Sequence, residues 1–157
     1  MKTFVLLFLL LTCSAAFTQQ KAAVNDPWAG TFKLDPGKSK FSGPSPQEET
    51  ISVAAARKDS IQYTVAGKDA NGNSYTIDYK GKADTESTEM MEGKPIAQIT
   101  YHMPSSHQFT SEGRGVDGST STGAITLSKD GKTITVHQHN KTAQGAEQDQ
   151  TFVYVRQ

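Results

Sequence analysis

The chain has 157 residues, in which 16 Lys and Arg residues balance 16 Asp and Glu residues, and it contains a single cysteine, Cys13. This neutral balance, with no basic stripe, argues against nucleic acid or an anionic membrane surface as the partner. One cysteine excludes an intrachain disulfide, so the folded domain depends on its own apolar core.

The first 19 residues have the layout of a secretory signal peptide. Lys2 precedes an apolar run from Phe4 to Leu11, and small residues follow around Ala15. The run is far shorter than the roughly 20 residues that a membrane-spanning helix needs. We therefore expect residues 1–19 to be cleaved and residues 20–157 to form one exported domain, periplasmic or extracellular, with no integral membrane segment.

A lipid-anchored form is the alternative for this N-terminal segment. The residues before and including Cys13 read LLTC, which loosely resembles the box at which a bacterial lipoprotein is cut and lipidated. Thr12 is unusual immediately before the cysteine of such a box. We therefore favour cleavage between Ala15 and Gln20 without a lipid.

The rest of the chain alternates apolar and polar residues in short runs. It holds only two leucines, Leu34 and Leu127, and is rich in Thr, Val, Ile and Tyr, which suit the half-buried surface of a strand. In chain order the alternating runs lie at residues 28–34, 51–53, 61–65, 75–79, 97–103, 125–127, 134–136 and 152–154. No long stretch has the apolar period of a helix.

Turn sequences separate these runs. They include Asp35-Pro36-Gly37 and Asn71-Gly72, and Asp130-Gly131 predicts a two-residue hairpin. Short strands joined by tight turns favour an antiparallel order, and closure removes the exposed edges of such a sheet. We predict an all-β domain, an up-and-down antiparallel meander closed into a barrel of about 8–10 strands.

The run from Trp28 to Leu34, WAGTFKL, resembles the first strand of the calycins and above all of the intracellular fatty-acid-binding proteins. Residues 28–41, 128–136 and 153–157 together resemble a family of small exported bacterial lipocalin-like proteins of largely unknown function. The resemblance spans nearly the whole chain after the signal. It implies a lipocalin-like β-barrel and says little about chemistry.

Two features depart from the fatty-acid-binding proteins. Those proteins carry a helix pair as a lid after the first strand, whereas Asp35–Glu49 has no helical pattern here. They also bind a ligand carboxylate through Arg-x-Tyr on the last strand, whereas this chain has Tyr154-x-Arg156 with Phe152 in the place of the Arg. We therefore expect no fatty-acid carboxylate site of that kind, and we expect Arg156 to be exposed to solvent.

The sequence lacks the signatures of catalysis and nucleotide binding. Gly113, Gly115 and Gly118 form a Gly-x-Gly-x-x-Gly pattern, but a strand-like sequence follows it, so we interpret it as a turn between strands. No nucleophile elbow is present. Glu48-Glu49, and Glu89 with Glu92, are interpreted as solvated charges in loop-like segments. We predict a protein that is not an enzyme, with no catalytic residues and no cofactor.

The histidines could either bind a metal ion or lie exposed to solvent. His137 and His139 project to the same face of a strand, away from Ile134, and His102 lies on the polar face of another. Three converging histidines would suit a metal-dependent enzyme. We favour solvated histidines and predict no metal site.

Aromatic residues on the apolar phase of the strands are the candidate ligand-binding residues. They are Trp28, Tyr63, Tyr75, Tyr79, Tyr101, Phe152 and Tyr154. Because a buried Tyr hydroxyl needs a partner, several inward tyrosines suit an amphipathic cavity. The favoured hypothesis is a monomer that binds a small apolar or amphipathic molecule without catalysis. The alternative is a barrel with a packed core and no ligand, which acts on another envelope protein through its surface.

Overall fold

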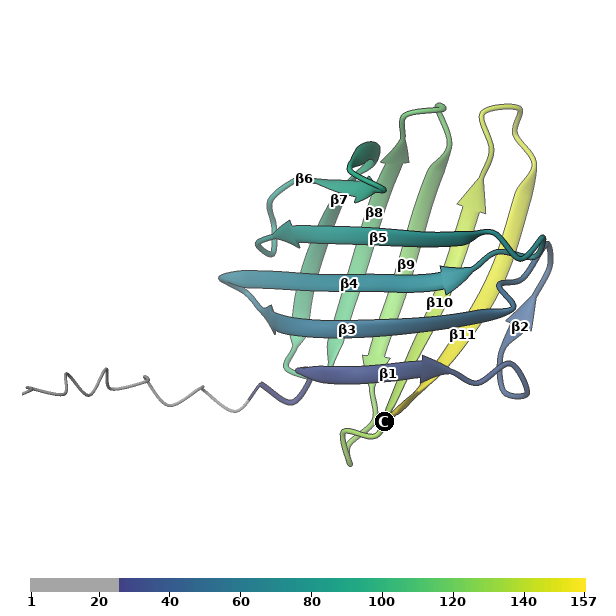
Figure 1. The fold of residues 1–157 in the computed structure, drawn as a ribbon. Coiled ribbons are helices and arrows are strands. Elements are labelled where there is room, and N and C mark those ends of the chain that lie inside the picture. The colour runs from purple at the N-terminus through teal and green to yellow at the C-terminus, as the bar shows by residue number, and fades with distance from the viewer. Residues whose placement is uncertain (1–25) are drawn as a thin grey trace, which may run out of the picture.

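The computed structural model describes residues 26–157, which form strands and turns (Figure 1). The strands are β1 (Gly30–Leu34), β2 (Lys40–Phe41), β3 (Glu48–Arg57), β4 (Ser60–Lys68), β5 (Ser74–Gly81), β6 (Ser87–Met91), β7 (Lys94–Ser105), β8 (Gln108–Gly115), β9 (Thr120–Leu127), β10 (Thr133–Lys141) and β11 (Glu147–Arg156). Among the described residues, no helix is long and apolar enough to cross a membrane. The predicted signal peptide and Cys13 lie outside the described residues.

The strands form one closed antiparallel barrel. Apart from β2, each strand pairs with the next along the chain, and β1 pairs with β11 through Phe32 and Arg156 to close the circle. The two-residue β2 adds to β11 at Thr151. Ten strands therefore make the barrel wall, and the predicted antiparallel, lipocalin-like meander is confirmed.

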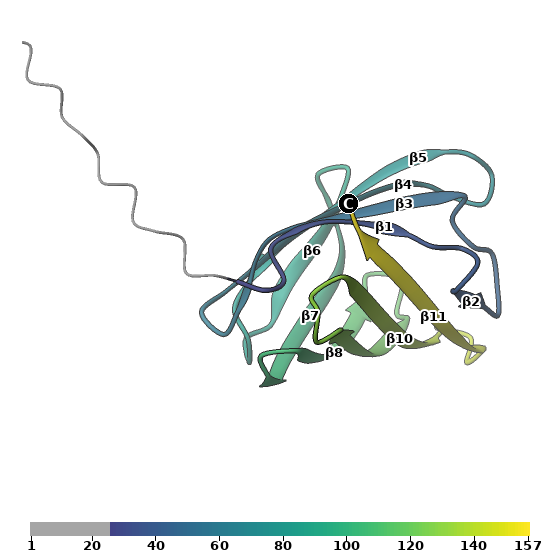
Figure 2. The same ribbon diagram turned by 90° about the horizontal axis from the view of Figure 1, so that it is seen from below.

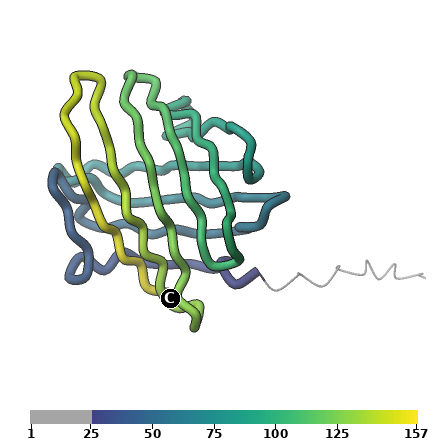
Figure 3. Tube along the Cα trace, turned by 180° about the vertical axis from the view of Figure 1, so that it is seen from behind, coloured from purple at the N-terminus to yellow at the C-terminus, as the bar shows by residue number. Residues whose placement is uncertain are grey.

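The barrel is flattened into two layers. Strands β1, β3, β4 and β5 form one layer, and β7–β11 cross behind it at a steep angle (Figures 1 and 2). The view from behind shows β7–β11 in front, with the β8–β9 and β10–β11 hairpins at one end and the C-terminus at the other (Figure 3). Side chains of alternate residues point into the space between the layers.

The buried apolar side chains form one core between the two layers, and Trp28, Phe109 and Leu127 belong to it at the end near the C-terminus. Its largest fully buried side chains are Tyr79, Phe32 and Leu127. Trp28 is only 2% exposed, and its indole N–H donates to the carbonyl oxygen of Ser106 at 2.8 Å. Its ring packs edge-on against Phe109, with centroids 5.1 Å apart. These contacts join the chain before β1 to the β7–β8 hairpin and seal this end.

The predicted hairpin at Asp130-Gly131 forms, but its loop is longer than two residues. The amide of Ser128 donates to the carbonyl of Thr133, and the amide of Gly131 donates to that of Ser128. Gly131 has φ +69°, and the Asp130 carboxylate accepts from the Ser128 hydroxyl. The loop is therefore a β-turn that ends in Gly131 in the left-handed conformation. A connection of this kind needs more than the two loop residues that were predicted.

The prediction that Arg156 is exposed to solvent is wrong, because its side chain is half-buried. Its guanidinium donates to the carbonyl oxygens of Pro27, Ala29 and Gly131 at 2.6–2.7 Å. The same group lies over the Phe32 ring, 4.3 Å from the ring centroid. The prediction rested on its place next to the C-terminus, but the pairing of β11 with β1 brings the side chain against the sealed end.

Gly30 is required by this arrangement. Its φ is +139°, a conformation that favours glycine, and a Cβ built on it would lie 2.3 Å from Nη1 of Arg156. The Gly in WAGTFKL therefore leaves the space through which Arg156 reaches the carbonyl of Ala29.

We expect Gly30→Ala to lower the free energy of unfolding by at least about 1 kcal/mol more than Gly145→Ala, measured by urea denaturation. Gly145 also has a positive φ, +89°, but nothing lies within 4 Å of the position that an alanine Cβ would take, so it controls for backbone strain alone. In an Arg156→Ala background, Gly30→Ala should lower the free energy of unfolding by less than it does in the wild type. Equal losses for the two glycines would contradict the role of Arg156.

Candidate functional site

A cavity of about 310 Å³ lies between the two layers of the barrel. Its wall is mostly aliphatic and aromatic, with Ile51, Val53 and Ile77 on one layer and Ile125 and Val136 on the other. The volume falls at the lower end of the range of small-molecule sites, about 300–1,000 Å³. The interior is thus not completely filled by side chains.

The wall changes from apolar to polar along β9, β10 and β11. The paired inward residues, from the sealed end upward, are Leu127, Ile134 and Tyr154, then Ile125, Val136 and Phe152, then Gly123, Gln138 and Gln150. Ser111 and Ser121 add hydroxyls beside Gly123. The apolar part lies deep in the barrel, and the polar part lies toward the β8–β9 and β10–β11 hairpins.

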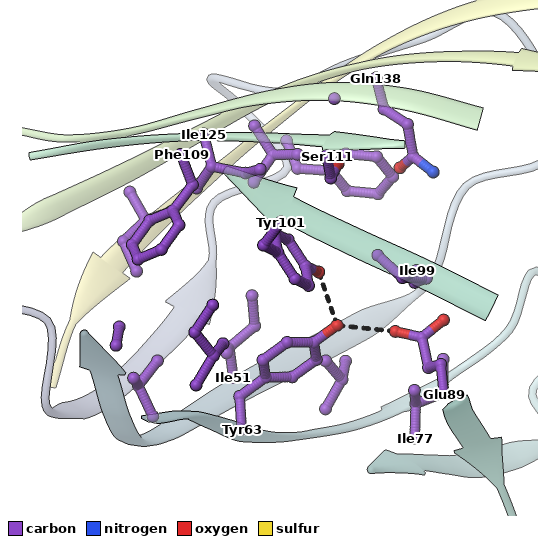
Figure 4. A pocket seen from close by; sticks show the side chains of 18 of the residues that line it. Ile51, Tyr63, Ile77, Glu89, Ile99, Tyr101, Phe109, Ser111, Ile125 and Gln138 are labelled. Atoms are coloured by element: carbon purple, nitrogen blue, oxygen red, sulfur yellow. Dashed lines mark hydrogen bonds between the residues drawn. The ribbon is translucent and has the colours of Figure 1, made fainter. Parts of the chain in front are cut away.

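A hydrogen-bonded chain crosses the cavity (Figure 4). The Tyr63 hydroxyl lies 2.7 Å from that of Tyr101 and donates to Oε1 of Glu89 at 2.7 Å. Burial raises the pKa of Glu89, although the hydrogen bond from Tyr63 opposes this rise. Burial also raises the pKa of both tyrosines, so both remain protonated donors at neutral pH.

Glu49 is a second carboxylate of the wall and is 9% exposed. The hydroxyls of Tyr75 and Tyr154 donate to its two oxygens. Burial and the neighbouring Glu49 carboxylate raise the pKa of both tyrosines. Both oxygens of Glu49 therefore have partners within the protein.

Five of the predicted ligand-binding residues line the cavity, namely Trp28, Tyr63, Tyr101, Phe152 and Tyr154. Tyr75 and Tyr79 share the inward phase of Ile77 but do not border the cavity. Tyr79 is packed behind the wall, stacked on Tyr63 at 5.3 Å and edge-on to Tyr101 at 5.1 Å. Whether any of the seven contacts a ligand stays a prediction.

The interpretation of Glu49 and Glu89 as solvated loop charges is wrong. Both residues lie in strands, β3 and β6, and both face the cavity. For Glu49 the sequence held a signal, because it shares the alternation phase of Ile51 and Val53. For Glu89 the local sequence gives no such signal, since β6 is short and its register with β7 shifts next to it.

Three of the histidines lie on the outer face of the β7–β11 layer. His102 pairs with Asp84 at 2.6 Å, His139 with Asp149 at 2.8 Å, and His137 with the Thr151 hydroxyl. His102 and His137 lie three strands apart, which corresponds to roughly 14 Å. Within residues 26–157, no group of three or more His, Cys, Asp or Glu residues is placed to share a metal ion.

Comparisons with known proteins identify the fold but no family. No protein-family model matches the chain, and no curated protein matches it. Among solved structures, a Schistosoma mansoni fatty-acid-binding protein in complex with arachidonic acid has a TM-score of 0.51 and 10% identity, covering 83% of this chain and 96% of its own. This chain therefore has the barrel architecture that includes the fatty-acid-binding proteins.

Two further barrels have the same architecture. A structure of EF1p2_mFAP2b bound to DFHBI has a TM-score of 0.53 and 12% identity, covering 83% of this chain and 94% of its own. A redesigned β-barrel, b11L5F_LGL, has a TM-score of 0.50 and 10% identity, with 83% and 92% coverage. At this level of identity the likeness concerns the fold alone.

The raised pKa of Glu89 predicts a pH-dependent cost of burying its charge. In the unfolded chain the Glu89 carboxyl has the ordinary pKa of about 4.3, whereas in the folded protein its pKa is higher. Between these two pKa values the folded state binds more protons than the unfolded state, so the free energy of unfolding of the wild type falls as pH rises. Because Gln does not titrate, the stability gained by Glu89→Gln should grow from about pH 4 toward pH 8. Urea denaturation over this range measures it. The exposed Glu112→Gln is the control, and a gain that falls as pH rises would contradict the prediction.

Proposed function

We propose that this protein is an exported barrel that binds a small apolar or amphipathic molecule without catalysis. The observation that carries the proposal is the cavity between the layers, apolar near Ile125 and Val136 and polar near Gln138 and Ser111. This order suits a molecule that buries an apolar body deep in the barrel and keeps a polar end near the hairpins.

The size of the cavity limits the ligand. If each non-hydrogen atom occupies about the 30 Å³ of a water molecule in the liquid, a cavity of 310 Å³ holds roughly ten such atoms. A short alkyl chain or a single substituted ring fits this volume. A long-chain fatty acid would extend beyond it.

The cavity favours ligand binding over the alternative of a packed core that acts only through its surface. A packed core would place the inward rings against one another, as Tyr79 is placed against Tyr63. Tyr101, Phe152 and Trp28 also contact other rings, but each of them has a side that borders the cavity. The neighbouring fold of a fatty-acid-binding protein in complex with arachidonic acid supports the same choice.

Trp28 is the only tryptophan and lines the cavity, so its fluorescence can report binding. We expect quenching by members of a panel of medium-chain alcohols, quinones and small aromatic metabolites. Val136→Phe fills the cavity and should weaken a bound compound at least about tenfold. Thr135→Phe, the next residue on β10 and outward-facing, should leave affinity within about twofold. If no compound binds below millimolar concentration, the binding proposal fails and the packed-core alternative replaces it.

Export is tested by sequencing the N-terminus of protein recovered from outside the cytoplasm. We expect the mature chain to begin between Ala16 and Lys21 and to carry no lipid, because the small residues around Ala15 follow the apolar run. Cys13→Ala should leave cleavage unchanged. Intact Met1 in the exported fraction would contradict cleavage, and loss of processing in Cys13→Ala would establish the lipid-anchored form instead.

A further inference from the structure

We propose that the cavity selects amphipathic molecules with a protonated amine, and that Glu89 is the residue that meets the ammonium group. This inference rests on the proposed binding function and names the chemical class of its ligand. It follows from the sign of the charges in the wall and from the hydrogen bonds that Glu89 makes and leaves open.

The charged side chains of the cavity wall are all acidic. Glu49 and Glu89 line it, and within residues 26–157 none of the lining residues is Lys, Arg or His. Arg156, the cation on the last strand, is directed to the sealed end, where three carbonyl oxygens and the Phe32 ring hold it. A ligand carboxylate would therefore meet like charge and no cation in this cavity.

Glu89 has the geometry of a head-group acceptor. Its Oε1 accepts from Tyr63, and Oε2 accepts no hydrogen bond from residues 26–157. With Tyr63 donating to Glu89, Tyr101 donates to Tyr63, so both hydroxyl dipoles support a negative charge on Glu89. An ammonium group at Oε2 would complete the hydrogen bonding of the carboxylate and offset the cost of burying it.

Glu49 plays a different part. Tyr75 and Tyr154 occupy both of its oxygens, so it has no open position comparable to Oε2 of Glu89. Its negative charge still adds to the field in the cavity. The apolar surface of Ile51, Ile77 and Ile99 lies around these acids and suits the alkyl or aryl part of the ligand.

The test compares three probes that differ only in the head group: octylamine, octan-1-ol and octanoate, titrated near neutral pH by calorimetry and by Trp28 fluorescence. Each has about the size that the cavity holds. We expect octylamine to bind at least about tenfold more tightly than octan-1-ol, and octanoate to bind more weakly than both.

Two variants locate the effect. Glu89→Gln keeps an acceptor for Tyr63 and removes the charge, so it should abolish the preference for octylamine over octan-1-ol. Ala97→Lys places an ammonium beside Glu89, its directly paired neighbour across β6 and β7, and should block octylamine while relieving the exclusion of octanoate. Glu112→Gln, on an exposed outer position of β8, makes the same charge change outside the cavity and should alter none of the three affinities.

The outcomes separate this inference from the function on which it rests. If octan-1-ol binds but octylamine binds no better, or if Glu89→Gln leaves the preference for octylamine intact, the amine assignment is wrong and the binding function stands. A preference for octanoate would also overturn it. If none of the three probes binds the folded wild-type protein, the binding proposal and the amine inference both fail. The variants are compared only after circular dichroism and melting curves show that they fold.

Discussion

The guanidinium of Arg156 reinforces the closure that the pairing of β1 with β11 makes. It donates hydrogen bonds to the carbonyl oxygens of Pro27 and Ala29, before β1, and of Gly131, in the β9–β10 turn. It also lies over the ring of Phe32. A planar cation with several donors can hold three carbonyl oxygens at once, which a lysine could not do with the same geometry. Because β1 and β11 are the first and last strands of the closed barrel, this contact fixes the ends of the meander to each other.

Sealing one end determines where the interior can stay open. Trp28 and Phe109 fill the space near the Arg156 contact, and the inward residues of β10 and β11 change from apolar to polar with distance from it. Tyr63 links the two regions, since its ring stacks on the buried Tyr79 while its hydroxyl faces Glu89. The packing that stabilises the fold therefore also positions the polar group of the cavity.

Alternation in the sequence was sufficient to predict the barrel and most of the cavity wall. A period of two places Tyr63, Tyr101 and Phe152 on the inner face whatever the details of register. It could not separate Tyr79, which fills space, from Tyr101, which borders it, because that distinction depends on how rings from three strands pack. Nor could it locate Arg156, whose partners are about 25 and more than 120 residues away along the chain. Contacts of this kind arise only once the barrel closes.

The cavity bears on the choice between binding and packing through its energetic cost. A cavity made in a closed apolar core costs about 24 cal/mol per Å³. This cavity is partly open and partly polar, so a cost of this kind falls on its apolar part beside Ile125 and Val136. Gln138, Ser111 and Glu89 offer the polar groups that a water molecule needs, so the polar end can be hydrated at lower cost. This domain has no disulfide within residues 26–157 to offset such a loss, so a molecule that fills the apolar part would stabilise the barrel as it binds.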